Sequence, residues 1–162
     1  MRDLAFAARI DAVRAFNRFY TRHIGVLRKD YLSTPYSLTE ARVLYELAHR
    51  ARPAASDLAR DLDLDAGYLS RLLRGFEVRG LIRRIASPED RRRRVLMLTR
   101  QGSEAFAPLN VRSQRQTAAM LRRLPAAGQA RLIEAMCTIE ALLRGGPVTR
   151  SAGQMPARRS SR

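Results

Sequence analysis

The sequence predicts a mainly α-helical chain with one two-stranded β hairpin, arranged as a winged helix-turn-helix. Three observations within residues 54–99 support this fold class. Two helical patterns are separated by a tight turn, two alternating five-residue runs follow, and an arginine-rich segment joins those runs. In such a fold the second helix enters the major groove of DNA. We therefore interpret the chain first as a DNA-binding protein.

Two helices are expected before this unit. Residues 4–31 carry apolar side chains every three or four positions, and Pro35 is expected to end that segment. Ser37 and Glu40 have the spacing of a capping box, which predicts a helix over about 38–49. The residues that we expect this helix to bury are Leu38, Val43, Leu44 and Leu47.

The helix-turn-helix is predicted over residues 55–79. Its first helix ends near Asp61, and the following turn requires a left-handed residue at Asp63, which aspartate tolerates better than most residues do. Asp65 is expected to cap the second helix, and Gly80 is expected to stop it.

Residues 81–98 form the predicted wing. The runs 81–85 and 94–98 alternate as paired strands, and residues 86–93 make the hairpin tip. From Arg71 to Arg94 the chain has nine arginines against three acidic residues, a local net charge of +6. Many phosphate contacts by one such unit make DNA binding strongly dependent on salt.

Two more helices are expected after the wing, within residues 99–144. We expect Pro108 to kink the first of them or to separate its first turn, and Pro125 to open the second. Residues 1–144 are then one domain, and 145–162 are a basic tail that we expect to be disordered.

The composition narrows the class of partner. The net charge is +16 and the pI is about 11.6, which favours polyanions such as DNA, RNA or an acidic membrane surface. A coding bias toward arginine would explain why Lys29 is the one lysine, but it would not explain the net charge. We expect no membrane span, no signal peptide and no internal disulfide, because Cys137 is the single cysteine; a cytoplasmic protein fits these facts.

The second helix of the helix-turn-helix supplies the candidate DNA contacts. Arg71 is expected to grip a guanine, and Arg74, one turn later, to meet phosphate. A solvated helix face is the plain alternative for Arg71, and core packing is the alternative for Tyr68. The full set of candidates on this helix is Ala66, Gly67, Tyr68, Ser70, Arg71 and Arg74.

The order of these elements resembles the MarR (multiple antibiotic resistance regulator) family over about residues 4–144. The sharpest match is the wing, where Asp90-Arg91-Arg92 is followed by Leu98-Thr99 and Gly102. The stretch LSRLLRGFEVRGLIRR is similar to the family's recognition helix running into its first wing strand. This resemblance implies a dimeric, sequence-specific transcriptional regulator. The favoured form is a repressor that is released from DNA by a small ligand.

The resemblance also assigns roles within the wing. Arg92 is expected to enter the minor groove, and Asp90 to hold its guanidinium by a charge-assisted bond. Arg91 and Arg93 are expected to meet phosphates. A hairpin tip that is merely polar is the alternative.

Dimerisation is assigned to the helices in 4–31 and 99–144, whose wide apolar faces would interlock between two subunits and present two recognition helices to a palindrome. Family members often bind a small aromatic molecule between these helices and the DNA-binding lobe. The candidates for such a pocket are Phe16, Phe19, Tyr20, His23 and Tyr45, with Tyr31 and Tyr36 beside them, although an aromatic stripe is also explained as core.

We expect no cofactor and no metal site, since His23 and His49 lack ligating partners at useful spacing. Cys137 is expected to be buried and inert.

The sequence supports two alternative hypotheses for the function of this chain. The first segments also resemble the MarR-type module of proteins that fuse it to a GNAT acetyltransferase, and a shortened fusion would be an alternative origin. No glycine-rich loop for acetyl-CoA is present, so we do not expect an enzyme. The other alternative is an architectural protein that binds DNA by charge alone.

Overall fold

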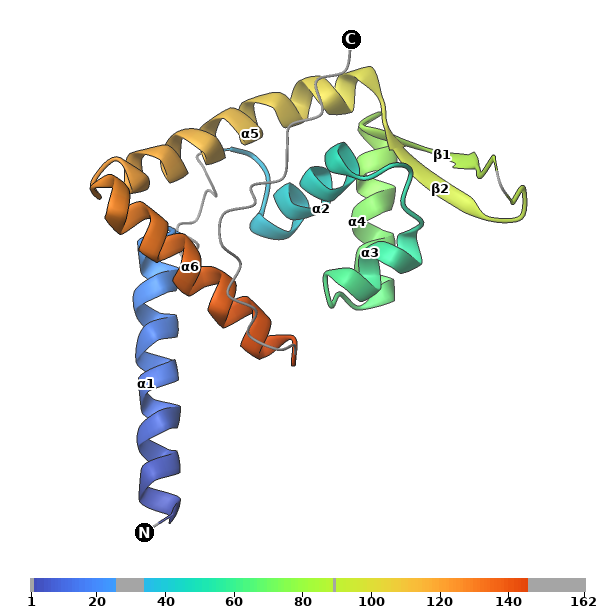
Figure 1. Cartoon of the computed structure of the whole chain (residues 1–162). Coiled ribbons are helices and arrows are strands. Elements are labelled where there is room, and N and C mark those ends of the chain that lie inside the picture. Colours follow the sequence, from blue (N-terminus) through green and yellow to red (C-terminus); the bar gives the residue numbers. More distant parts are fainter. Residues whose placement is uncertain (1, 26–33, 89, 146–162) are drawn as a thin grey trace. The chain divides into compact units, whose positions relative to one another are not determined.

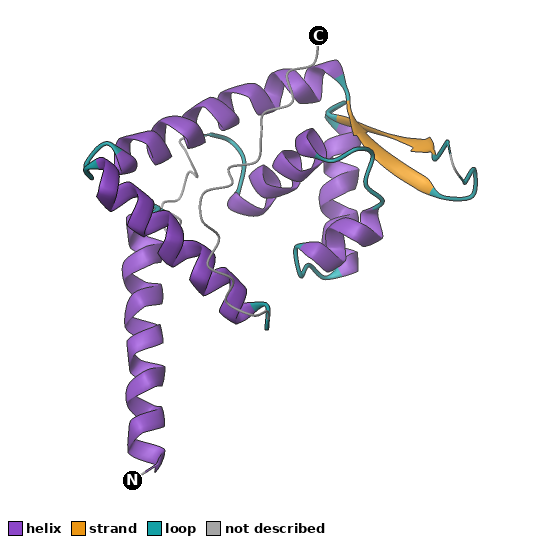
Figure 2. Cartoon of the chain, in the orientation of Figure 1, coloured by secondary structure: helices purple, strands orange, loops and turns teal. Residues whose placement is uncertain are grey.

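The computed structural model describes residues 2–25, 34–88 and 90–145, and it is mainly helical with one two-stranded sheet, as the sequence predicts. Figures 1 and 2 show the order of its elements. The elements are α1 (Arg2–His23), α2 (Leu38–His49), α3 (Ala55–Asp61), α4 (Ala66–Val78), β1 (Ile82–Ala86), β2 (Arg94–Leu98), α5 (Arg100–Leu121) and α6 (Ala126–Leu143). The chain divides into two compact units, residues 1–114 and 115–162, with the boundary inside α5.

Helix α1 is shorter than the periodicity predicted. It ends at His23, where Gly25 has a φ of 72° and donates its N–H to the carbonyl oxygen of Arg22 at 3.2 Å. A glycine in the left-handed region is a common way to end a helix, so Gly25 and not Pro35 sets this boundary. The rest of the expected segment, including Tyr31, lies outside the described residues.

Helix α2 begins at the predicted capping box. The Glu40 backbone N–H donates to Ser37 Oγ at 3.2 Å, and the Ser37 N–H donates to Glu40 Oε2 at 2.9 Å. Leu44 and Val43 are fully buried, but Leu38, expected inside, is 40% exposed at the first turn. The fully buried large side chains of the core come from four elements and are Phe76, Leu44, Leu58, Leu69, Leu73, Leu96 and Val43.

Glu40 also joins the start of α2 to the end of α4, because Arg79 donates to its Oε1 at 2.8 Å. Burial raises the pKa of Glu40, but hydrogen bonds from Ser37 and Arg79 together outweigh burial, and the pKa lies below its usual 4.5. A carboxyl group whose pKa is lowered on folding stabilises the fold above its unfolded pKa. That contribution is lost as the pH falls through the folded pKa.

Replacing Glu40 by glutamine should therefore destabilise the protein by about 0.5–1 kcal/mol near neutral pH, because glutamine keeps an oxygen for Ser37 but loses the charge facing Arg79. Urea unfolding from about pH 7 to about pH 3 should show the gap between the two proteins narrowing below the unfolded pKa. Glu104→Gln is the matched control, since the Arg100–Glu104 pair is largely exposed. A gap that stays constant with pH would contradict the assignment.

Strands β1 and β2 form the wing. They pair antiparallel with Ile82 opposite Leu98 and Ile85 opposite Val95. The connector before α3 adds one hydrogen bond to the edge of this sheet, from the Leu96 N–H to the Pro53 carbonyl oxygen at 2.9 Å. The wing therefore starts from a base that is tied to the helices.

Helix α5 runs without interruption through Pro108, so the proline does not separate its first turn. Pro125 is the N-cap of α6, as the sequence predicts. Cys137 lies on α6 and is exposed, so the expectation that it is buried is wrong for the single chain. None of the residues of α6 is buried by the part of the chain that the structure describes.

Apolar side chains are left uncovered on α1 and α6. The exposed large apolar residues of these two helices are Leu4, Phe6, Ile10, Val13, Phe16, Phe19, Ile133, Ile139, Leu142 and Leu143. None of the helices in the described part of the chain is long and apolar enough to cross a lipid bilayer. Each of these two helices thus exposes an apolar face among the residues that the structure describes.

Candidate nucleic-acid interface

The turn before α4 fixes how this helix begins. Asp63 has a φ of 51°, which is the left-handed conformation expected for it. Asp65 caps the helix, and its Oδ1 accepts the Tyr68 backbone N–H at 2.7 Å. A backbone hydrogen bond of 2.9 Å from the Leu64 N–H to the Ala59 carbonyl oxygen ties the turn to α3. The start of α4 is therefore held by short-range bonds.

The two faces of α4 differ sharply. Leu69, Leu73 and Phe76 are buried in the core. All six candidate contact residues on this helix lie on its exposed side, namely Ala66, Gly67, Tyr68, Ser70, Arg71 and Arg74. Tyr68 is 40% exposed, so it is not the core residue of the alternative reading. No carboxylate among the described residues forms an ion pair with Arg71 or Arg74, which leaves both cations available to a ligand.

Gly67 leaves room beside Arg71. A Cβ at Gly67 would lie 3.2 Å from Asp65 Oδ1 and 3.6 Å from Arg71 Nη1. An added side chain would therefore crowd the cap at Asp65, while a Cβ would only reach ordinary van der Waals contact with Arg71. The absence of a side chain at Gly67 thus leaves the Asp65 cap undisturbed and also leaves space for a ligand.

Asp90 organises the backbone of the wing tip. Its Oδ1 accepts the Arg92 backbone N–H at 2.9 Å, and its carbonyl oxygen accepts the Arg93 N–H at 2.9 Å. This differs from the expected bond to the Arg92 guanidinium: the aspartate shapes the turn, as its short side chain favours. The side chains of Arg91 and Arg92 are exposed and pair with no carboxylate among the described residues; Glu89 lies outside those residues.

Arg93 binds a carboxylate in this structure, whereas the sequence analysis expected it to meet a phosphate. Its Nη2 donates to Asp57 Oδ2 on α3 at 2.5 Å, so in this structure it binds a carboxylate of its own chain. Arg84 on β1 likewise pairs with Glu77 on α4 at 2.8 Å. The wing is thus tied to the helices by two ion pairs.

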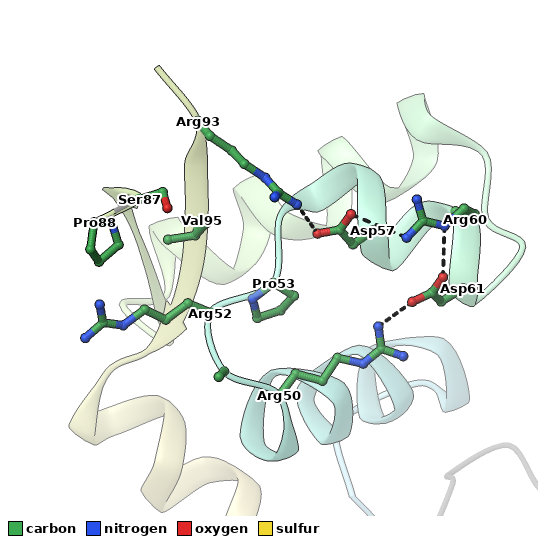
Figure 3. A pocket seen from close by; sticks show the side chains of 11 residues that line it. Arg50, Arg52, Pro53, Asp57, Arg60, Asp61, Ser87, Pro88, Arg93 and Val95 are labelled. Carbon is green, nitrogen blue, oxygen red and sulfur yellow. Dashed lines mark hydrogen bonds and ion pairs between the residues drawn. The ribbon is translucent and has the colours of Figure 1, made fainter. Parts of the chain in front are cut away.

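A groove of about 560 Å³ lies beside the Arg93–Asp57 pair. Figure 3 shows arginines and aspartates facing one another across it, from the connector, α3 and the base of the wing. Arg52 in the connector has a φ of 52°, which is uncommon for an arginine. The groove is lined by Arg50, Ala51, Arg52, Pro53, Asp57, Arg60, Asp61, Ser87, Pro88, Arg93 and Val95.

The other end of the wing is fixed by Thr99. Its Oγ1 donates to the Gly80 carbonyl oxygen at 2.6 Å and accepts the Gly102 N–H at 3.0 Å. The Thr99 N–H donates to the Leu81 carbonyl oxygen at 2.9 Å. A Cβ at Gly102 would lie 1.9 Å from that same oxygen. The threonine and the glycine three residues later thus close the wing against the start of α5.

The sequence was compared with models of known protein families, and one family matches the central part of the chain. The model of the MarR family matches residues 36–93, which run from the start of α2 to the wing tip. This part of the chain is therefore similar to the MarR family. No curated protein sequence gives a significant match.

Solved structures extend the likeness to most of the chain. The PcaV transcriptional regulator from Streptomyces coelicolor is 22% identical with a TM-score of 0.62, covering 83% of this chain and 98% of that one. A mutant MarR from E. coli complexed with operator DNA is 23% identical with a TM-score of 0.62, covering 86% and 96%. BpsR from Bordetella bronchiseptica, described with regulation of its DNA binding by 6-hydroxynicotinic acid, is 16% identical with a TM-score of 0.62, covering 78% and 91%. The chain shares the fold of MarR-type transcription regulators.

The aromatic pocket candidates fall into two groups, one on α1 and one on α2. On α1, Phe16 stacks on Tyr20 and Phe19 stacks on His23. On α2, Tyr45 stacks on His49 with ring centroids 4.0 Å apart. Tyr45 also lines a cavity of about 190 Å³ between α2 and the first half of α5. The described residues contain no group of three metal-ligating side chains.

Sequence reasoning missed Asp57. It stands 36 residues before its partner Arg93, and nothing in the local spacing marks it. The signal available was chemical: an aspartate in the first turn of a short helix, close to an arginine-rich hairpin in a known fold. The register of the hairpin and the place of α3 beside it were needed to choose Arg93 among the neighbouring arginines.

Proposed function

We propose that this chain is a dimeric, sequence-specific DNA-binding transcriptional regulator. Two features of the same lobe support this proposal. The exposed face of α4 carries Arg71 and Arg74, and the exposed wing tip carries further arginines. An exposed helix face with cations suits the major groove, and an arginine on a β hairpin suits a narrow minor groove.

Dimer formation follows from the uncovered faces of α1 and α6. Apolar side chains with this much exposure stabilise a protein when a second copy covers them, and a twofold dimer uses the same faces of both copies. A dimer also doubles the number of recognition helices, so that a palindromic site with half-sites one helical turn apart is the matching DNA.

A small aromatic molecule is the proposed effector, and repression relieved by that molecule is the proposed response. The support is the small cavity beside Tyr45, together with the aromatic side chains Phe16, Phe19, Tyr20 and His23 on α1. A ligand that binds one spacing of the two DNA-binding lobes better than another would shift the population and change the affinity for DNA.

Charge alone supports a second candidate, an architectural protein that binds DNA without sequence preference. The net charge of +16 favours it. The defined start of α4 and the aspartate-built turn of the wing favour the regulator, because charge-only binding does not require either of them. No feature of the described residues favours an acetyltransferase.

Selection of bound duplexes from a random pool at moderate salt tests the proposal. We expect enrichment of an inverted repeat of about 16–20 base pairs, because two recognition helices lie about one turn of DNA apart. Arg71→Ala in the same selection should relax the preference at one base pair of each half-site, by about 1–3 kcal/mol. Binding without enrichment would favour the architectural candidate and would leave the ligand proposal without a basis.

A further inference from the structure

Asp57 connects the start of α3 to the wing. Its Oδ2 accepts both the Ala54 backbone N–H at 3.1 Å, at the start of α3, and Arg93 Nη2 at 2.5 Å, next to the wing tip. Its Oδ1 accepts Arg60 Nη2 at 3.4 Å. The side chain of Asp57 is only 25% exposed, whereas that of Arg93 is 48% exposed. A single carboxylate thus holds the first turn of the helix and the hairpin together.

The same series of charges continues to α2. Arg60 Nε donates to Asp61 Oδ1 at 3.1 Å, and Arg50 donates to Asp61 Oδ2 at 2.5 Å. Arg50 also donates to Glu46 Oε2 at 2.6 Å, and Glu46 is buried. Hydrogen bonds from Arg50 and Arg60 hold the pKa of Asp61 below its usual value. Figure 3 shows the part of this series from Arg93 to Arg50.

A two-stranded ribbon needs such support. Hairpins of this size are marginally stable by themselves, and they twist and bend more than larger sheets do. At the base, the buried side chains of Val95 and Leu96 fix β2 to the core. Beyond them, Arg93 is the last residue before the tip whose side chain is bonded to a helix among the described residues.

We propose that Asp57 is a positioning residue for the wing: through Arg93 it sets the direction in which the tip carries Arg91 and Arg92. Arg93 then acts in DNA binding through this ion pair and does not meet a phosphate. The inference rests on the proposed DNA-binding function and replaces the role expected for Arg93 from the sequence.

The two roles of Arg93 predict opposite effects of Asp57→Asn. Asparagine still offers an oxygen to the Ala54 N–H, so the start of α3 is kept while the charge facing Arg93 is removed. If Arg93 were a phosphate contact, this change would free it and remove a negative charge near DNA, so the affinity would rise. If Asp57 positions the wing, the affinity should fall, by about threefold to tenfold.

A double-mutant cycle on the full chain measures this, with the duplex chosen by selection as the probe. Asp57→Asn and Arg93→Gln should each weaken binding to a similar extent, and the double variant should be no weaker than either one, because both remove the same contact. The slope of affinity against salt should stay unchanged for Arg93→Gln, since no phosphate contact is lost. Arg93→Lys should restore part of the affinity, because lysine keeps the charge.

Wing mobility without DNA supplies an independent readout. Backbone order parameters of Arg91 and Arg92, measured by NMR on the free protein, should fall in Asp57→Asn while those of α4 stay constant. Unchanged order parameters, or a rise in affinity with Asp57→Asn, would overturn the inference. Failure of the wild type to prefer any duplex would instead overturn the proposed function, and the mobility measurement would still decide the role of Asp57.

Discussion

Replacing Arg92 by alanine should lower the affinity for the selected DNA by about 30-fold or more. A base-reading or groove-inserted arginine contributes on the order of 1–3 kcal/mol, and a dimer carries two of them. The Arg92 side chain is exposed and pairs with no carboxylate among the described residues, so the folded protein loses no contact of its own. Thermal unfolding and the dimer should therefore be unaffected, and a binding titration at fixed salt measures the loss.

The control separates the position of the charge from its amount. Arg100→Ala removes the same charge from the start of α5, where the side chain is 94% exposed and pairs only with Glu104 among the described residues. Its effect on affinity should stay below about threefold, as expected for a single screened surface charge. Equal losses for Arg92→Ala and Arg100→Ala would mean that general charge, and not the wing, determines binding.

Features set by a few neighbouring residues were predictable from the sequence. The capping box at Ser37, the left-handed Asp63, the cap at Asp65 and the stop at Gly80 are all confirmed, because each depends on bonds that span at most four or five residues. The two strands were also predictable, with a shift of one residue at both ends of β1. These local features place the exposed face of α4 and the ends of the wing.

Three features were not predicted, two of them local and one that depends on a distant partner. The end of α1 at His23 was missed, since the apolar periodicity continues past Gly25 while the backbone at that glycine turns away. Asp90 was given the wrong partner because two donors of the same residue, the Arg92 N–H and its guanidinium, both lie within reach in sequence. The ion pair of Arg93 with Asp57 was not predicted, because Asp57 lies on another element far away in the sequence.

The exposed apolar faces of α1 and α6 show what an apolar pattern on a helix can and cannot predict. An apolar stripe on a helix indicates that something covers it, but not whether the cover comes from the same chain. Phe19 and Leu142 are 54% and 61% exposed in the described structure, so the apolar pattern of each helix does not by itself identify what covers it. Cys137 is exposed for the same reason, since α6 has no buried residue in the described structure.

Replacing Gly102 by alanine should destabilise the fold by about 2–4 kcal/mol. The added Cβ would meet the Leu81 carbonyl oxygen at 1.9 Å and its carbon at 2.8 Å, and backbone atoms cannot yield as a flexible side chain does. Moving that carbonyl would also weaken the bond that it accepts from the Thr99 N–H. The loss is a large share of the 5–15 kcal/mol typical of a domain, and urea unfolding measures it.

Gly75→Ala is the matched control, since it makes the same change inside helix α4. A Cβ there meets nothing within 4 Å, so the variant should be stabilised by about 0.5–1 kcal/mol through the better helix propensity of alanine. The opposite signs of the two substitutions would locate the effect in the closure of the wing against α5. If Gly102→Ala proved as stable as the wild type, the contact between Gly102 and Leu81 would not hold the wing base. The placement of Arg92 would then have to come from the helices alone.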